Sequence, residues 1–188
     1  MNLPNLITLI RLALIPVFIA LCWATLYTPA LIVFFVASVT DFLDGHIARI
    51  TNQKTDLGAL LDPLVDKILV TAGFITLLEI DLVPHIIPGW AVILILAREF
   101  LVTGLRTILM NYGVLLSAGT LGKLKTVLQV ASIMVLYLAL SIIDVDKVYY
   151  SYTLMAGYVF FYTAVAITLI SGVEYIIKSL KYLKTSCS

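Results

Sequence analysis

Four aspartates lie within one short stretch of an otherwise apolar chain, as two pairs: Asp41 with Asp44, and Asp62 with Asp66. A carboxylate inside a membrane is costly unless it is paired, hydrated or bound to a cation. Four of them together therefore indicate a bound positive charge. Carboxylate oxygens with few soft ligands nearby suit Mg²⁺ or Mn²⁺ better than zinc. A carboxylate-rich site of this kind can hold two ions about 3.5–4 Å apart.

Three small residues lie beside these aspartates, namely Gly45, Ala48 and Gly58. They would let a bulky phosphate approach the helix backbone, and Arg49 adds a planar positive group that suits phosphate. Metal ions, arginine and small residues together predict a diphosphate site. The alternative is a set of buried ion pairs, such as Asp44–Arg49 or Asp66–Lys67, or a solvated turn. It is disfavoured because repeated unpaired buried carboxylates are costly.

The composition predicts an integral membrane protein. The chain has 188 residues, of which 62% are hydrophobic and 12% charged, and its mean hydropathy is +1.09. Soluble domains have roughly 45–50% apolar and about 25% charged residues. We expect a single membrane domain over residues 1–188. The two cysteines, Cys22 and Cys187, lie at opposite ends and are expected to be unpaired.

The apolar runs predict an all-α fold, a bundle of six transmembrane helices. Asn5, after Pro4, is expected to cap the first helix. No basic residue precedes that helix and Arg11 interrupts it, so it is expected to remain in place rather than act as a cleaved signal. The sixth is too long for one perpendicular span. The expected helices cover about 5–26, 29–50, 56–79, 86–111, 121–143 and 149–179.

Positive charge predicts the orientation. The second and fourth connections and the tail carry most of the basic residues, which are Arg49, Lys54, Lys123, Lys125, Lys178, Lys181 and Lys184. The first, third and fifth connections hold only Lys147. The positive-inside rule then places both termini and the aspartates on the cytoplasmic side.

Helical spacing explains how the aspartates could meet. Asp41 and Asp44 are three residues apart, and Asp62 and Asp66 are four apart, so each pair shares a helix face. An antiparallel hairpin of the two helices would bring all four carboxylates to one level. A divalent-cation transporter could also use such carboxylates. It would need charged residues in the outer halves of the helices, where this chain has almost none.

These residues resemble a known family. The pattern Asp-x2-Asp-Gly-x2-Ala-Arg-x8-Gly-x3-Asp-x3-Asp is similar to the signature of the CDP-alcohol phosphatidyltransferases. Every fixed position is present, at Asp41, Asp44, Gly45, Ala48, Arg49, Gly58, Asp62 and Asp66. Some family members have an amphipathic helix before the first span. Only four residues precede Asn5, so that element is expected to be truncated or missing here.

The resemblance implies a mechanism and a set of site residues. The four aspartates would bind two divalent cations that grip the diphosphate of a CDP-linked lipid, and Asp66 would also be the general base. The acceptor alcohol would attack the β-phosphorus and CMP would leave. Gly45, Arg49 and Thr55 match positions that contact CDP in relatives, and Asn5 and Thr8 would complete the cytidine side. Relatives also imply a homodimer.

Several cations lie at one expected membrane level and indicate a second anion, carried by the acceptor. With Thr103, they are the expected acceptor-phosphate residues: Arg11, Arg98, Thr103, Arg106, Lys123 and Lys125. Other roles are open for some of them. Arg98 could form a structural ion pair with Glu99, Lys123 and Lys125 could be positive-inside anchors, and Arg11 could reach toward water from the membrane.

Three shorter segments look like those of bacterial phosphatidylglycerophosphate synthases. They are Pro4-Asn5-x2-Thr8-x2-Arg11, Ala97-Arg98-Glu99 with Leu105-Arg106, and Gly122-Lys123-x-Lys125-Thr126. This resemblance implies CDP-diacylglycerol as donor, sn-glycerol 3-phosphate as acceptor, and a bacterial inner (cytoplasmic) membrane location. Inositol phosphate, serine and phosphatidylglycerol remain alternative acceptors. A catalytically dead scaffold is disfavoured by the intact aspartate set. Membrane lipids are expected partners, and nucleic acid is not.

Overall fold

The computed structural model describes residues 3–51, 56–80, 86–111 and 120–186. For residues 3–7, 41–51 and 56–63, and for a few near the ends of the last three helices, it describes the backbone alone. Within these ranges every regular element is a helix, so the predicted all-α class is confirmed. The helices are α1 (Leu3–Trp23), α2 (Tyr27–Thr51), α3 (Asp56–Glu79), α4 (Gly89–Asn111), α5 (Thr120–Ser141) and α6 (Lys147–Ser186).

The first helix differs from its prediction at both ends. It begins at Leu3, so Asn5 lies inside α1 and the predicted N-cap at Asn5 is wrong. Pro4 falls in the first turn, where a missing N–H costs nothing. The helix ends at Trp23 rather than near residue 26, because Thr25 has a φ of 56°, in the left-handed region that an α-helix cannot include.

Local chemistry also moves the starts of two later helices. α4 begins at Gly89 rather than near residue 86, because Pro88 disfavours the helical conformation in the residue before it. α6 begins at Lys147, where the Asp146 carboxylate accepts hydrogen bonds from the backbone N–H groups of Val148 at 2.7 Å and Tyr149 at 3.2 Å. Such a cap satisfies donors that the first helical turn leaves open. At its other end α6 continues to Ser186, beyond the expected end near residue 179.

Two of the described helices are long and apolar enough to cross a membrane: Leu121–Ser141 and Lys147–Leu180, with mean hydropathies of 1.7 and 1.8. Thr8–Trp23 and Tyr27–Thr40 are shorter apolar segments. Large apolar side chains point outward in both parts of the chain, for example Phe35, Ile93 and Phe100. An exposed apolar surface of this kind is suited to lipid. The predicted six transmembrane helices remain a prediction.

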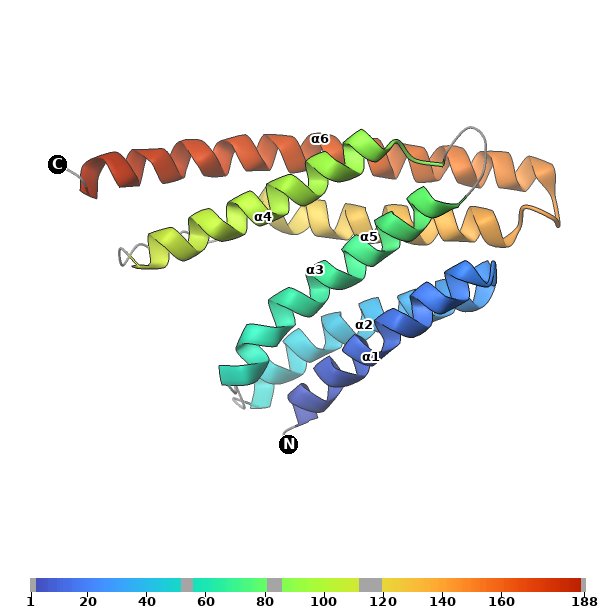
Figure 1. Cartoon of the computed structure of the whole chain (residues 1–188), viewed down its shortest axis with the longest axis horizontal. Coiled ribbons are helices and arrows are strands. Elements are labelled where there is room, and N and C mark those ends of the chain that lie inside the picture. Colours follow the sequence, from blue (N-terminus) through green and yellow to red (C-terminus); the bar gives the residue numbers. More distant parts are fainter. Residues whose placement is uncertain (1–2, 52–55, 81–85, 112–119, 187–188) are drawn as a thin grey trace. The chain divides into compact units, whose positions relative to one another are not determined.

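The structure divides into two compact units. The first comprises Met1–Ile86 and Ile133–Gly157. Within it α1 packs against α2 and α3, as Figure 1 shows for the blue and green helices. Its core is aromatic: the ring of Phe18 lies 5.3 Å from that of Phe34 and 5.4 Å, edge-on, from that of Tyr137. Such tilted and edge-on pairs add to the stabilisation from burial.

Polar groups inside this first core are hydrogen-bonded. The Tyr137 hydroxyl lies 2.6 Å from the Thr76 hydroxyl and accepts a 3.2 Å hydrogen bond from the Cys22 thiol. Thr76 also donates to the backbone carbonyl of Ala72 at 2.7 Å. Pro16 lies within α1, two residues before the buried Phe18. The core therefore ties α1, α3 and the end of α5 together around one tyrosine.

The second unit comprises Ile87–Ser132 and Tyr158–Ser188. It contains α4, the first half of α5 and most of α6, and Arg98 on α4 contacts Ser171 on α6. Ile95, Val102 and Leu109 are buried at intervals of seven residues along α4, which marks its core-facing side. Arg98 and Glu99 lie within the same helix, so the packing of α4 also places its charged residues.

Candidate active site

The aspartate pairs lie at the end of one helix and in the first half of the next. Asp41 and Asp44 belong to α2, and Asp62 and Asp66 to α3. Each pair sits inside uninterrupted helix, so its two members share a face. α2 and α3 also contact each other within the first unit. Contact between the two helices is what a shared carboxylate site requires of the backbone.

Most residues predicted to bind the metals or the nucleotide have side chains that the structure does not describe. For Asn5, Asp41, Asp44, Gly45, Ala48, Arg49, Gly58 and Asp62 the structure describes only helical backbone. Thr55 lies outside the described residues altogether. Among the side chains that are described, no group of three or more His, Cys, Asp or Glu is close enough to hold a metal ion. The predicted metal ligands thus remain a prediction.

Asp66 is the member of the set whose side chain is described, and it contacts Arg11. The Nη1 of Arg11 donates to the Oδ1 of Asp66 at 2.9 Å, which joins α1 to α3. The Arg11 side chain is only 1% exposed, whereas that of Asp66 is 39% exposed. The carboxylate is therefore held by a buried guanidinium while more than a third of its side chain stays exposed.

Thr8 lies one helical turn before Arg11 and is also buried. The sequence predicted Thr8 for the cytidine side and Arg11 for the acceptor phosphate. The structure places both on the buried face of α1, and places Arg11 against the predicted base. α1 thus contributes to the same site as α3.

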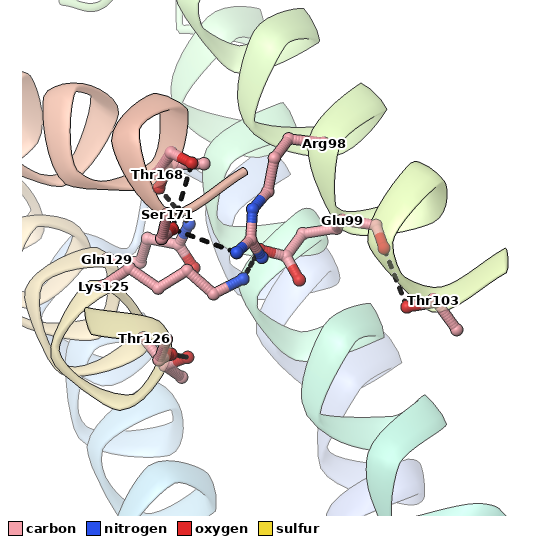
Figure 2. Close-up of polar contacts among 9 residues, drawn as sticks. Arg98, Glu99, Thr103, Lys125, Thr126, Gln129, Thr168 and Ser171 are labelled. Atoms are coloured by element: carbon pink, nitrogen blue, oxygen red, sulfur yellow. Dashed lines mark hydrogen bonds and ion pairs between the residues drawn. The ribbon is translucent and has the colours of Figure 1, made fainter. Parts of the chain in front are cut away.

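A second charged cluster lies in the other unit, around Glu99 (Figure 2). The Oε1 of Glu99 pairs with the ammonium of Lys125 on α5, and lies 3.4 Å from Nη1 of Arg98. All three side chains are largely buried, with exposed fractions of 11% for Arg98, 18% for Glu99 and 7% for Lys125. One carboxylate thus lies between two cations, leaving this group of three with a net positive charge.

The guanidinium of Arg98 also rests on α6. Its Nη2 donates to the Oγ of Ser171 at 3.0 Å. The next residue, Gly172, passes so close that a Cβ there would lie 2.9 Å from Cγ of Arg98 and 3.4 Å from its Nε. Such distances leave no room for a methyl group without a shift. Ser171 and Gly172 therefore form the part of α6 against which the Arg98 side chain packs.

Two further polar residues extend this network, and the sequence analysis did not single them out. Nε2 of Gln129, one turn after Lys125 on α5, donates to the hydroxyl of Thr168 at 3.3 Å. The Oγ of Ser171 donates to the carbonyl of Thr168 at 3.1 Å. The sequence does contain a signal that could have found them. It is a pair of polar residues one helical turn apart within an apolar helix, as in Thr168–Ser171 and Lys125–Gln129.

The other predicted acceptor residues on α4 and α5 are more exposed. The Thr103 hydroxyl donates to the backbone carbonyl of Glu99 at 2.7 Å, one turn earlier on α4. Arg106 and Lys123 are exposed, Arg106 on α4 and Lys123 near the start of α5. The structure thus brings Arg98 and Lys125 together through Glu99. Arg11 is found with Asp66 in the first unit.

Residues 1–170 match the sequence model of a family described as CDP-alcohol phosphatidyltransferase. The chain belongs to this family. The eight signature positions from Asp41 to Asp66 lie inside the matched segment. The transferase family assignment expected from the signature is therefore confirmed.

Curated relatives match the chain over nearly its full length. A Bacillus subtilis (strain 168) protein named CDP-diacylglycerol–glycerol-3-phosphate 3-phosphatidyltransferase is 41% identical over 200 aligned positions, covering 98% of each chain. A Rickettsia bellii protein of the same name is 38% identical, covering 96% of this chain and 97% of its own. A Mycobacterium tuberculosis (strain ATCC 25618 / H37Rv) protein named probable phosphatidylglycerophosphate synthase is 34% identical, with coverages of 96% and 82%.

Proposed function

We propose that this chain transfers the phosphatidyl group of CDP-diacylglycerol to sn-glycerol 3-phosphate, producing phosphatidylglycerol phosphate and CMP. The observation that carries this proposal is the near full-length similarity to relatives named for that reaction. The aligned region covers 98% of the chain for the Bacillus relative, so it spans the sequence in which both charged clusters lie. One cluster would serve the chemistry and the other would bind the acceptor.

In the proposed reaction, a hydroxyl oxygen of the acceptor forms a bond to the β-phosphorus of the donor. The bond from that phosphorus to the oxygen bridging it to CMP breaks, and CMP leaves with the bonding electrons. The proton of the hydroxyl passes to the Asp66 carboxylate. A positioned carboxylate acting as general base contributes about 10²–10⁴-fold to such a step. The half-exposed side chain of Asp66, oriented by Arg11, has the access that this role needs.

Asp41, Asp44, Asp62 and Asp66 would hold two Mg²⁺ or Mn²⁺ ions. The donor set fits these metals, because all four ligands are hard oxygen donors and come from two helices in contact. When bound, such ions supply positive charge that offsets the negative charge on the transferred phosphoryl group and the leaving phosphate.

The nucleotide side of the site is assigned from the family signature and from α1. Arg49 would add a fixed positive group at the diphosphate, while small side chains let the diphosphate approach the backbone. The buried position of Thr8, beside Arg11, places it on the inner face of α1. The proposed CDP-lipid contacts are Asn5, Thr8, Gly45, Ala48, Arg49, Thr55 and Gly58.

The cluster around Glu99 would receive the phosphate of the acceptor. A phosphate is well matched by an arginine, which can donate two parallel hydrogen bonds, together with a lysine ammonium. Arg98 and Lys125 supply this pair in a largely buried setting, where charge interactions are less screened. The proposed phosphate contacts in this unit are completed by Thr103, Arg106 and Lys123.

We also propose the arrangement in the membrane that the charge pattern predicts. Six helices would span the bacterial inner membrane as one domain, with both termini and the active site on the cytoplasmic side. The two long apolar helices and the outward-facing apolar side chains support membrane insertion. A homodimer is proposed from the family resemblance.

The test is an acceptor panel. The purified chain in lipid vesicles is given CDP-diacylglycerol and Mg²⁺, with glycerol 3-phosphate, serine, inositol phosphate or phosphatidylglycerol in turn. We expect CMP release and a labelled lipid product with glycerol 3-phosphate. Turnover with another alcohol and none with glycerol 3-phosphate would refute the acceptor assignment. Metal flux across the vesicles in the absence of nucleotide would instead favour a transporter.

A further inference from the structure

Two buried cations of the second unit contact one acidic residue, which has so far been given no part in substrate binding. Arg98 lies on α4 and Lys125 on α5, and both side chains are almost fully buried. Two buried positive charges side by side repel one another, and each loses hydration when it leaves water. Their coexistence in one place therefore requires a negative group between them.

Glu99 is that group. Its Oε1 atom contacts both the Lys125 ammonium and Nη1 of Arg98, as Figure 2 shows. Both contacts use the same carboxylate oxygen, so the two cations converge on one point. In the described part of the chain, the second oxygen, Oε2, has no hydrogen-bond or ion-pair partner.

The opposite side of Arg98 is held by α6. Ser171 accepts a hydrogen bond from Nη2, and Gly172 leaves the space in which the arginine stem lies. The guanidinium is thus held at Nη1 by Glu99 and at Nη2 by Ser171. A side chain fixed in this way loses little further rotational freedom when it binds an anion, which favours affinity.

We propose that Glu99 is a positioning residue for acceptor binding, whose carboxylate holds Arg98 and Lys125 side by side as one site for the acceptor's phosphate. This inference rests on the proposed function. Two cations and one carboxylate carry a net single positive charge between them, which suits the binding of an anionic phosphate. Exposed Arg106 and Lys123 add further positive charge in the same unit.

The first test is Glu99→Gln, which keeps the shape of the side chain and removes its charge. We expect the KM for glycerol 3-phosphate to rise at least tenfold, with kcat lowered less than threefold and the KM for CDP-diacylglycerol unchanged. Glu174→Gln is the matched control, because Glu174 pairs with Lys178 on the exposed surface of α6. A lower KM for glycerol 3-phosphate would show that Glu99 competes with the anion and would overturn the proposal. An unchanged KM would overturn it too.

A double-mutant cycle separates positioning from a general structural effect. If Glu99 acts through Lys125, Glu99→Gln should raise the KM for glycerol 3-phosphate far less when Lys125→Gln is already present. Fully additive effects would overturn the proposal. Glu99→Asp keeps the charge on a shorter side chain, and its KM should lie between those of the wild type and Glu99→Gln. Should Glu99→Gln fail to fold, Glu99→Asp decides: a raised KM for glycerol 3-phosphate alone supports the proposal, and unchanged values overturn it.

A binding measurement keeps this test independent of turnover. Inorganic phosphate and glycerol 3-phosphate are titrated into the purified wild-type and Glu99→Gln chains, with calorimetry as the readout. We expect measurable phosphate binding by the wild type and at least tenfold weaker binding by the variant. Absence of turnover with glycerol 3-phosphate in the wild type would refute the proposed function but not the role of Glu99 in binding phosphate. Equal phosphate binding by both chains would defeat the role of Glu99.

Discussion

Arg11 on α1 donates a 2.9 Å hydrogen bond to Asp66 on α3, across 55 positions of sequence. The buried guanidinium thereby holds a carboxylate whose side chain is 39% exposed. The sequence predicted different roles for these residues, Arg11 as a contact of the acceptor phosphate and Asp66 as a metal ligand and the general base. Their contact makes Arg11 a candidate for orienting the base.

Asp66→Asn should abolish turnover and leave CDP-lipid binding largely intact. The amide keeps the size of the side chain but cannot take up the acceptor's proton, so we expect kcat to fall about 10²–10⁴-fold. CMP release measures turnover, and equilibrium binding of the CDP-lipid measures the donor site. Asp144→Asn, at an exposed aspartate between α5 and α6, is the control and should behave like wild type. Near-normal turnover by Asp66→Asn would remove it from the base role.

Arg11→Gln distinguishes two roles for the arginine. If it orients Asp66, the substitution should lower kcat about tenfold or more, since misplaced reacting groups are costly, while the KM for glycerol 3-phosphate changes little. Steady-state kinetics with each substrate varied in turn gives the answer. A raised acceptor KM with normal kcat would instead place Arg11 among the phosphate ligands, as its position in the sequence suggested.

Gly172→Ala should weaken acceptor binding through crowding. The new methyl group would lie 2.9 Å from Cγ of Arg98, so the arginine side chain must move from its position beside Ser171. We expect the KM for glycerol 3-phosphate to rise about three- to tenfold, in line with about 1 kcal/mol of overpacking strain. Gly104→Ala on α4 is the control, because no atom lies within 4 Å of its added Cβ. Equal kinetics for both alanine variants would contradict the close packing.

Removal of divalent metal should stop the reaction reversibly. After chelation with EDTA and dialysis, we expect less than about 1% of the original CMP release, because the ions would offset the charge of the transferred phosphoryl group, and the loss of even one stabilising donor at an oxyanion hole costs about 10²–10³-fold in kcat. Added Mg²⁺ or Mn²⁺ should restore activity. Full activity in the chelated protein would contradict the proposed role of the four aspartates.

Tyr137→Phe should destabilise the first unit without touching either charged cluster. The hydroxyl that is removed contacts both Thr76 and Cys22 in the buried core. We expect a loss of about 1–2 kcal/mol, the usual cost of leaving buried hydrogen-bonding groups without a partner. Unfolding in a mixed-detergent titration measures it. Tyr149→Phe, at an exposed position on α6, should leave the midpoint unchanged.

The helices and the family could be predicted from the sequence, because both depend on short-range patterns. Apolar runs and the spacing of Asp41, Asp44, Asp62 and Asp66 are local features. The predicted last residue of α1 and the predicted first residue of α4 were wrong because a single residue sets each of these helix boundaries. Thr25 takes a left-handed conformation that its type does not announce, and Pro88 acts on the residue before it.

The partners of the charged residues could not be predicted, because they depend on packing between distant segments. The pairing of Arg98 with Glu99 was weighed from their adjacency, but Lys125 meets Glu99 across 26 positions. Ser171 reaches Arg98 across 73 positions. No pattern along the chain relates an arginine on one helix to a glycine on another. The packing of Arg98 against Gly172 could therefore be found only from the structure.

Pro16 divides α1 into two parts that contact different groups of residues. Its ring removes a backbone hydrogen bond and crowds the carbonyl one turn earlier, which makes this the point where α1 bends most easily. Thr8 and Arg11 lie before it, while Phe18 and Cys22 lie after it in the aromatic core. The contact with Asp66 and the aromatic core therefore lie on opposite sides of the residue at which α1 bends most easily, so a change in the tilt of the leading half shifts Arg11 relative to Phe18.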